Sequence, residues 1–252
     1  MIKLNEREER ARKRVCLPLD GLQTIEELEE RVKELSPVVG LFKIGKESFT
    51  RFGPASIKAV KNYGAEVFLD LKYHDIPNTV KGAAETATSL GVYMFNVHAS
   101  GGLEMMRAAR EGVYRAIEYF KKVPKILGVT VLTSLDKEKL NKELRVPGEV
   151  EEQVLSLAKM SYQAGLDGVV CSAADLHAIR DKLPKDFMYI TPGIKGTKTP
   201  AGEDQKRVFS PGNAIRDGSS ILVVGRAITD QKTPEERLQA GYEILQDMTP
   251  YL

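Results

Sequence analysis

The amino-acid sequence predicts an α/β protein made of a single (β/α)8 barrel, the TIM barrel fold. Short runs of β-branched and aliphatic residues alternate with longer amphipathic runs, which is the pattern of βα units built on a parallel sheet. Eight such units follow one another without a linker, and the 252 residues fit the roughly 250 that are typical of this barrel. A doubly wound open sheet is the alternative, but its G-x-G-x-x-G turn is missing after the first strand, where Asp20, Gly21 and Leu22 stand.

The strands are expected where a short apolar run is bounded by turn residues. Strands covered by helices on both sides are nearly continuous in apolar residues, because neither face meets water. Pro18 lacks the N–H that a sheet needs, so the first strand is expected to be irregular there. In chain order, the expected strands are residues 15–20, 41–45, 66–71, 93–98, 125–132, 168–171, 188–191 and 221–225.

A helix is expected after each strand, where apolar residues recur with the helical period. Thr24 and Glu27 have the spacing of a capping box at the start of the first helix. Gly64 suits the end of the second helix, and Asn78 or Thr79 suits the start of the third. In chain order, the expected helices are residues 24–35, 54–63, 78–90, 103–120, 149–164, 174–183, 211–216 and 234–247.

Residues 1–13 are expected to be a charged extension before the barrel domain, which would take residues 14–252. Between residues 7 and 14, charges of both signs recur at helical spacing. This pattern is typical of a solvated helix, and an arm that binds nucleic acid is the alternative.

Charge and composition argue against several classes of partner. The net charge of +2 is close to balanced, which disfavours nucleic acid. No run approaches the roughly 20 apolar residues of a membrane-spanning helix, and the start of the chain lacks the apolar segment of a signal peptide. Cys16 and Cys171 fall in apolar strands and are expected to be buried free thiols. We therefore expect a cytoplasmic protein with no nucleic-acid and no membrane partner.

Charged residues gather where the second and third strands end, and in a barrel that end carries the chemistry. Asp70 and Lys72 are two residues apart, so in a regular strand both side chains take the same face. With Lys43 from the second strand and Asp75 from the following loop, they can form an alternating Lys-Asp-Lys-Asp array in which every charge has an opposite neighbour. An ordinary ion-pair network at the barrel rim is the alternative. The histidines have no metal-ligand spacing, so no metal site is expected.

A second candidate site follows the seventh and eighth strands, where barrels commonly bind phosphate. Gly225 allows the backbone to approach an anion closely, and Arg226 offers a forked donor. Gln205, in the Gly- and Lys-rich loop 193–207, can add an amide, and residues 195–204 are the candidate lid. The sequence therefore predicts an anion site at this end of the barrel.

Residues 70–79 read D-L-K-Y-H-D-I-P-N-T, which matches the D-x-K-x-x-D-I-P-N-T signature of the orotidine 5'-monophosphate decarboxylase family. The chain resembles this family from about residue 20 to residue 226. The further matching segments, in the expected order, are residues 42–45, 96–102, 132–134, 191–194, 204–207 and 224–226.

The resemblance implies removal of CO2 from orotidine 5'-monophosphate, with uridine 5'-monophosphate as the product and no cofactor. Asp70 would lie beside the substrate carboxylate, and Lys72 would be the general acid that protonates C6. Asp75 and Thr79 would reach into the active site of the other subunit of a homodimer.

The resemblance also implies how the nucleotide is held. Asp20 and Lys43 would contact the ribose hydroxyls, and Thr133 or Ser134 would bind the pyrimidine. The 5'-phosphate ligands would be Gln205, Gly225 and Arg226.

The chain departs from the family pattern at Lys195, where the family usually has arginine. Lysine keeps the charge but lacks the bidentate fork, which leaves a substrate contact there open. Two other functions remain as alternatives. One is a Mg²⁺-dependent sugar-phosphate decarboxylase or aldolase of the same superfamily, which carries an acid where Lys43 stands. The other is a barrel that binds a nucleotide without catalysis, for which a buried charged array would serve no purpose.

Overall fold

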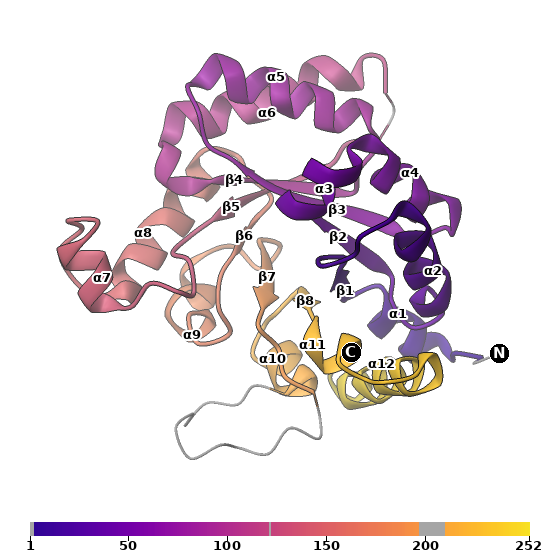
Figure 1. Ribbon diagram of the computed structural model, residues 1–252. Coiled ribbons are helices and arrows are strands. Elements are labelled where there is room, and N and C mark those ends of the chain that lie inside the picture. Colours follow the sequence, from indigo (N-terminus) through magenta and orange to yellow (C-terminus); the bar gives the residue numbers. More distant parts are fainter. Residues whose placement is uncertain (1–2, 121, 197–209) are drawn as a thin grey trace. The chain divides into compact units, whose positions relative to one another are not determined.

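The structure is a computed structural model that describes residues 3–120, 122–196 and 210–252. Eight parallel strands follow one another in chain order in a closed barrel, so the predicted (β/α)8 fold is confirmed (Figure 1). The chain divides into two compact units. Unit 1 comprises Met1–Asp70 with Thr191–Leu252, and unit 2 comprises Leu71–Ile190.

Unit 1 holds the strands at both ends of the chain. Strand β1 pairs with β2 on one side and with β8 on the other, and β2 also pairs with β3. The register places Lys43 of β2 beside Pro18 of β1, and Gly45 beside Asp70 of β3. Its strands are β1 (Val15–Pro18), β2 (Leu41–Gly45), β8 (Ile221–Val223) and the part of β3 (Glu66–Tyr73) that ends at Asp70.

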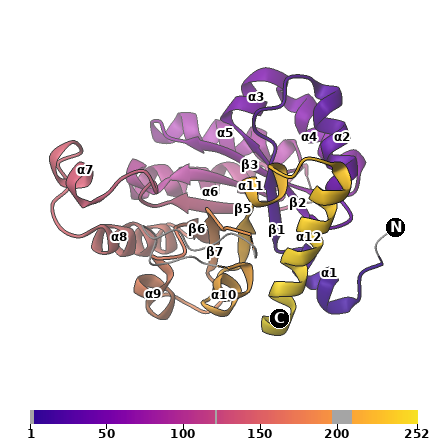
Figure 2. The same cartoon turned by 60° about the horizontal axis from the view of Figure 1, so that its bottom comes forward.

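The helices of unit 1 come from both segments of the chain. Helices α1 and α12 contact each other, as Figure 2 shows. In chain order, the helices are α1 (Glu6–Arg12), α2 (Ile25–Leu35), α3 (Lys46–Phe52), α4 (Pro54–Asn62), α10 (Pro211–Arg216), α11 (Arg226–Thr229) and α12 (Pro234–Met248), followed by the 3-10 turn η3 (Thr249–Tyr251).

Unit 2 is continuous in sequence. Its strands β4 (Met94–His98), β5 (Lys125–Val129), β6 (Gly168–Val170) and β7 (Met188–Pro192) pair in order, with the part of β7 up to Ile190 in this unit. Its helices are α5 (Pro77–Ser89), α6 (Leu103–Ile117), α7 (Lys137–Lys142), α8 (Val150–Gln163) and α9 (Leu176–Ile179), with the 3-10 turns η1 (Ala99–Gly101) and η2 (Arg180–Lys182).

Helices α5 and α6 pack side by side because a glycine stands at their crossing (Figure 1). A Cβ atom at Gly112 of α6 would lie 2.2 Å from the carbonyl oxygen of Lys81 in α5. No larger residue fits at this distance, so Gly112 sets how closely the two helices approach.

Several expected strands are shorter in the structure than the apolar runs that predicted them, β1 and β5 among them. Strand β1 ends at Pro18 instead of continuing to residue 20, since proline offers no N–H to the ladder. Strand β5 ends at Val129 instead of residue 132, and Leu132 is 40% exposed. In both places the chain leaves the sheet before the residues expected to carry function.

The helix starts also differ in part from the expected caps. Thr24 is the N-cap of α2, and its hydroxyl accepts from Glu27 N, but the Glu27 carboxylate accepts from Gln23 N. Helix α5 begins at Pro77 with Ile76 as N-cap, so the expected Asn78 or Thr79 cap is wrong. Proline is favoured at the first helical position because that N–H has no intrahelical partner.

Helix α1 is tied to the rest of unit 1 by specific bonds. Asn5 and Glu8 form its capping box, and the Glu8 carboxylate also accepts from the Tyr242 hydroxyl of α12 at 2.7 Å. Arg12 donates to the carbonyl of Ser36 at 3.1 Å, beyond the end of α2. In the described parts of the chain, no helix is both long enough and apolar enough to span a membrane.

Candidate active site

Three charged side chains of unit 1 meet where β2 and β3 end. The Lys43 ammonium lies 3.1 Å from Asp20 Oδ2 and 3.3 Å from Asp70 Oδ2. Lys43 reaches this place because β2 lies between β1 and β3, and Asp20 stands two residues beyond the end of β1. The structure therefore brings the predicted site residues Asp20, Lys43 and Asp70 together in one cluster.

The three side chains of the cluster differ in how far they are exposed to solvent. The side chains of Lys43 and Asp70 are 12% and 11% exposed, whereas that of Asp20 is 46% exposed. Burial lowers the pKa of the Lys43 ammonium, but the attraction of Asp70 and then of Asp20 outweighs burial and raises that pKa. Lys43 therefore stays charged at neutral pH and neutralises the buried carboxylate beside it.

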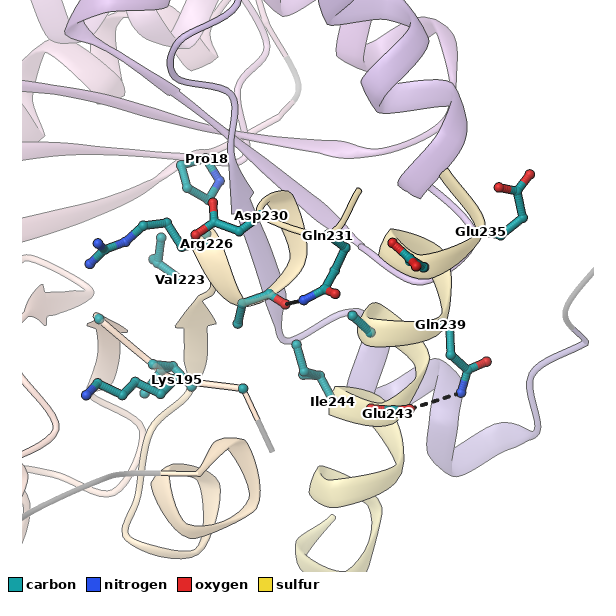
Figure 3. Close-up of a pocket in the computed structure, with 17 residues that line it drawn as sticks. Pro18, Lys195, Val223, Arg226, Asp230, Gln231, Glu235, Gln239, Glu243 and Ile244 are labelled. Atoms are coloured by element: carbon teal, nitrogen blue, oxygen red, sulfur yellow. Dashed lines mark hydrogen bonds between the residues drawn. The ribbon is translucent and has the colours of Figure 1, made fainter. Parts of the chain in front are cut away.

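A cavity of unit 1 lies beside the Gly225–Arg226 turn and is shown in Figure 3. Lys195 and Arg226 extend their side chains to the same side of this view, away from α12. The Arg226 side chain is exposed and makes no hydrogen bond or ion pair with any residue in the described part of the chain. Both cations can therefore meet an anion that enters from that side. Gln205 and most of the candidate lid lie outside the described residues.

The backbone of unit 2 is strained at Lys72, near the end of β3. Lys72 has a φ of +52°, in the left-handed region that residues with side chains rarely adopt. Its N–H donates to the Oδ1 of Asn96 at 2.8 Å, and Asn96 on β4 is fully buried. Such strain persists only where the surroundings hold it, and it is common at functional sites. It also means that the alternation of a regular strand does not extend through Lys72.

The other predicted residues of unit 2 are exposed in loops and at a helix start. Asp75 accepts from the N–H of Ile76 at 2.6 Å, just before α5, and Thr79 lies in the first turn of that helix. Thr133 and Ser134 lie in the segment that follows β5. Each of these four side chains can therefore be reached from outside the unit.

A family model described as "Orotidine 5'-phosphate decarboxylase / HUMPS family" matches residues 13–240. The chain belongs to this family.

Relatives with the decarboxylase name cover most of the chain. The orotidine 5'-phosphate decarboxylase of Syntrophus aciditrophicus (strain SB) is 49% identical over 222 residues, which are 88% of this chain and 88% of that protein. That of Moorella thermoacetica (strain ATCC 39073 / JCM 9320) is 48% identical over 82% of each chain. The crystal structure of orotidine 5'-phosphate decarboxylase from Lactobacillus acidophilus has a TM-score of 0.80 at 37% identity and covers 93% of this chain and 98% of its own.

Three residues shape the site of this family member without having been assigned a role from sequence. A Cβ atom at Gly45 would lie 2.7 Å from Asp20 Oδ1 and 2.9 Å from Lys43 Nζ, so glycine there leaves room for the observed positions of these two side-chain ends. Buried Ser48 of α3 donates to the carbonyl of Leu19 and so anchors the chain next to Asp20. Asn96 holds the Lys72 backbone. Gly45 and Asn96 lie inside segments that resemble the family, so the sequence could have indicated a role for them. No sequence pattern indicated a role for Ser48.

The donor groups of the site are arranged for salt bridges. The described parts of the chain contain no group of three or more His, Cys, Asp or Glu side chains placed to hold a metal ion. The Lys43 ammonium stands between the carboxylates of Asp20 and Asp70 and pairs with both. The rings of His74 and His98 pack against each other in unit 2, with centroids 5.3 Å apart.

Proposed function

We propose that this protein decarboxylates orotidine 5'-monophosphate to uridine 5'-monophosphate, the last step of de novo pyrimidine biosynthesis, without a cofactor. The observation that carries the proposal is the buried pair of Lys43 and Asp70, with Asp20 on its outer side. Family membership and the names of its close relatives support the same reaction.

The reaction breaks the bond between C6 of the pyrimidine and its carboxylate carbon. The bonding electrons stay on C6 while CO2 leaves, and the proton of the Lys72 ammonium ends on C6. A fixed cation stabilises this charge only as it develops, which lowers the barrier more than it strengthens substrate binding. Lys72 then regains a proton from solvent. Its left-handed backbone, bonded to Asn96, supports a fixed position for this group.

Asp70 and Lys43 set the charge that meets the substrate carboxylate. Lys43 keeps Asp70 ionised in a buried place, and the array is completed in our proposal by Lys72 and Asp75. Beside an ionised Asp70, the carboxylate of the substrate is less stable than the neutral CO2 that it becomes. Such ground-state destabilisation is a contested contribution to catalysis, so most of the acceleration is assigned to Lys72.

The 5'-phosphate is proposed to bind beside Gly225 and Arg226, with Gln205 as a further ligand. Arg226 and Lys195 both line the cavity of Figure 3 and extend their side chains to the same side, which supports this assignment. The phosphate is remote from the bond that breaks, so its binding energy can drive closure and orientation instead of chemistry. In the same proposal, Asp20 and Lys43 bind the ribose hydroxyls, and Thr133 or Ser134 binds the pyrimidine.

We further propose a homodimer in which Asp75 and Thr79 complete the active site of the partner subunit. Support comes from the exposed start of α5, where apolar Ile76 is 67% exposed between Asp75 and the helix. A two-fold interface uses the same patch on both subunits, so each subunit would lend these residues to the other.

The proposal is tested by an ultraviolet assay of the purified protein with orotidine 5'-monophosphate in the presence of a chelator. We expect turnover by the wild-type protein, loss of turnover in Lys72→Ala, and wild-type turnover in Lys58→Ala, which removes an exposed lysine of α4. Activity that the chelator abolishes and Mg²⁺ restores would favour the sugar-phosphate alternative. Nucleotide binding without turnover in the wild-type protein would favour the non-catalytic barrel.

A further inference from the structure

A second cavity borders the Gly225–Arg226 turn, on the side of β1. Its volume is about 240 Å³, several times the roughly 30 Å³ that one water molecule occupies in the liquid. Pro18, Gly225 and Arg226 line both this cavity and that of Figure 3. Asp20 and Arg31 of α2 also line the second cavity. The turn proposed to bind the 5'-phosphate therefore borders two cavities, and Arg31 in the second cavity has no assigned ligand.

Arg31 is a largely buried cation without a full partner. Its side chain is 21% exposed, and its one ion pair in the described part of the chain is with Glu34 at 3.8 Å, too long for a hydrogen bond. Glu34 instead accepts two hydrogen bonds from Arg237, at 2.7 and 3.0 Å. Burial and then the nearby Arg237 lower the pKa of Arg31, as expected for an under-compensated charge. The five N–H donors of a guanidinium thus remain available to a ligand.

The charges around the cavity favour an anion. Among the described residues that line it, Arg31 and Arg226 are cations and Asp20 is the one carboxylate. Asp20 is already paired with Lys43 at 3.1 Å, which offsets most of its repulsion of an anion. Glu27 also acts on Arg31, but more weakly than Glu34, and Glu34 is itself neutralised by Arg237. Two arginines facing one cavity are a common arrangement for binding phosphate.

We propose that this cavity is a subsite for a second phosphoryl group, so that the protein also binds pyrimidine ribonucleoside 5'-diphosphates. The inference rests on the proposed function for the position of the first phosphate. From there, the second phosphoryl group meets Arg31, while Arg226 contacts both groups. A diphosphate bound in this way competes with the substrate, which makes the subsite inhibitory.

The experiment is calorimetric titration of uridine 5'-monophosphate and uridine 5'-diphosphate into the wild-type protein, Arg31→Gln and Lys33→Gln. Lys33 is an exposed residue of the same helix, so its variant controls for the loss of one positive charge. Arg31→Gln should weaken diphosphate binding by about tenfold or more, the scale of a lost charge-assisted bond. In Arg31→Gln, the affinity for the monophosphate should change by less than about twofold. In Lys33→Gln, the affinities for the monophosphate and the diphosphate should each change by less than about twofold. The Glu34–Arg237 pair remains in Arg31→Gln, and its melting temperature verifies the fold.

Equal losses of monophosphate and diphosphate affinity in Arg31→Gln would overturn the subsite, and so would equal diphosphate losses in the two variants. A titration with inorganic pyrophosphate separates the subsite from the proposed function. Pyrophosphate binding that depends on Arg31, without any binding of the monophosphate, would support the anion subsite and contradict the proposed function. Monophosphate binding and turnover without an effect of Arg31 on the diphosphate would contradict the subsite alone.

Discussion

Gly45 has no side chain, and this leaves room for the observed positions of the Asp20 and Lys43 side-chain ends. Gly45→Ala would place a methyl group 2.7 Å from Asp20 Oδ1 and 2.9 Å from the Lys43 ammonium. We expect kcat/KM to fall by about tenfold or more, because the pair must separate or shift to admit the methyl group. Steady-state kinetics checks this. Gly82→Ala is the matched control, since a Cβ atom there meets no heavy atom within 4 Å. Unchanged kinetics in Gly45→Ala would mean that the ion pair has no part in turnover.

Arg226 and Lys195 are cations that line the same cavity, but they are expected to contribute differently to transition-state binding. Arg226→Ala should cost about 3 kcal/mol of transition-state binding, close to a hundredfold in kcat/KM, because a forked charge-assisted contact to phosphate is lost. Activity on orotidine, which lacks the phosphate, should hardly change. Equal losses on the two substrates would exclude Arg226 as the phosphate ligand.

Lys195→Ala serves as the comparison within that experiment. A flexible point charge is expected to contribute less than a planar guanidinium, so the loss should be well below that of Arg226→Ala. A loss of the same size would show that Lys195 has taken the role of the usual family arginine.

At the scale of elements, Asp167 joins three parts of unit 2. It lies just before β6, accepts from Ile126 N of β5 at 2.9 Å, and pairs with Lys125 of β5 and Arg110 of α6. Burial opposes ionisation, but these donors outweigh burial and lower the pKa of Asp167 below its usual value. The carboxylate therefore stabilises the fold above the unfolded pKa near 3.8, and this stability is lost as the pH falls through the lower, folded value.

Asp167→Asn should lower the free energy of unfolding by about 2 kcal/mol at pH 7. The difference from the wild-type protein should shrink as the pH falls below about 4, because the wild-type carboxylate then becomes protonated too. Urea unfolding across this pH range measures both effects. A difference that stays constant down to pH 2 would contradict the assignment to the charged form.

The whole molecule is expected to act as a dimer with shared sites. Lys72→Ala and Asp75→Asn homodimers should each be nearly inactive. In a mixed dimer, one site collects both changes and the other holds an intact Lys72 and an intact Asp75. Re-pairing the two inactive proteins should therefore restore up to about half the activity of each heterodimer. No recovery, with heterodimers confirmed by mass, would show that Asp75 serves its own subunit.

The barrel could be predicted from the sequence because strand and helix periods are properties of local stretches. The proximity of Lys43 to Asp70 was also predictable, since strand ends converge in this fold. Two kinds of feature could not be predicted: very short helices, and backbone geometry that depends on residues distant in sequence. Helices α3, α7 and α11 are short segments of four to seven residues, below the length at which a period becomes clear. The strained backbone at Lys72 depends on Asn96, which is distant in sequence.

The pairing of β1 with β8 has a consequence for synthesis on the ribosome. Strand β1 emerges early, but its partner β8 is made only after residues 71–190. At roughly 5–20 residues per second, this interval lasts on the order of ten seconds. During that time, one edge of the nascent β1 presents unpaired backbone groups, which are prone to pair with other chains. Helix α1 emerges before β1. The hydrogen bond between its Glu8 and Tyr242 can form only after Tyr242, near the end of the chain, has been made. The N-terminal segment of this protein is therefore expected to stay exposed to pairing with other chains until β8 and α12 have been made.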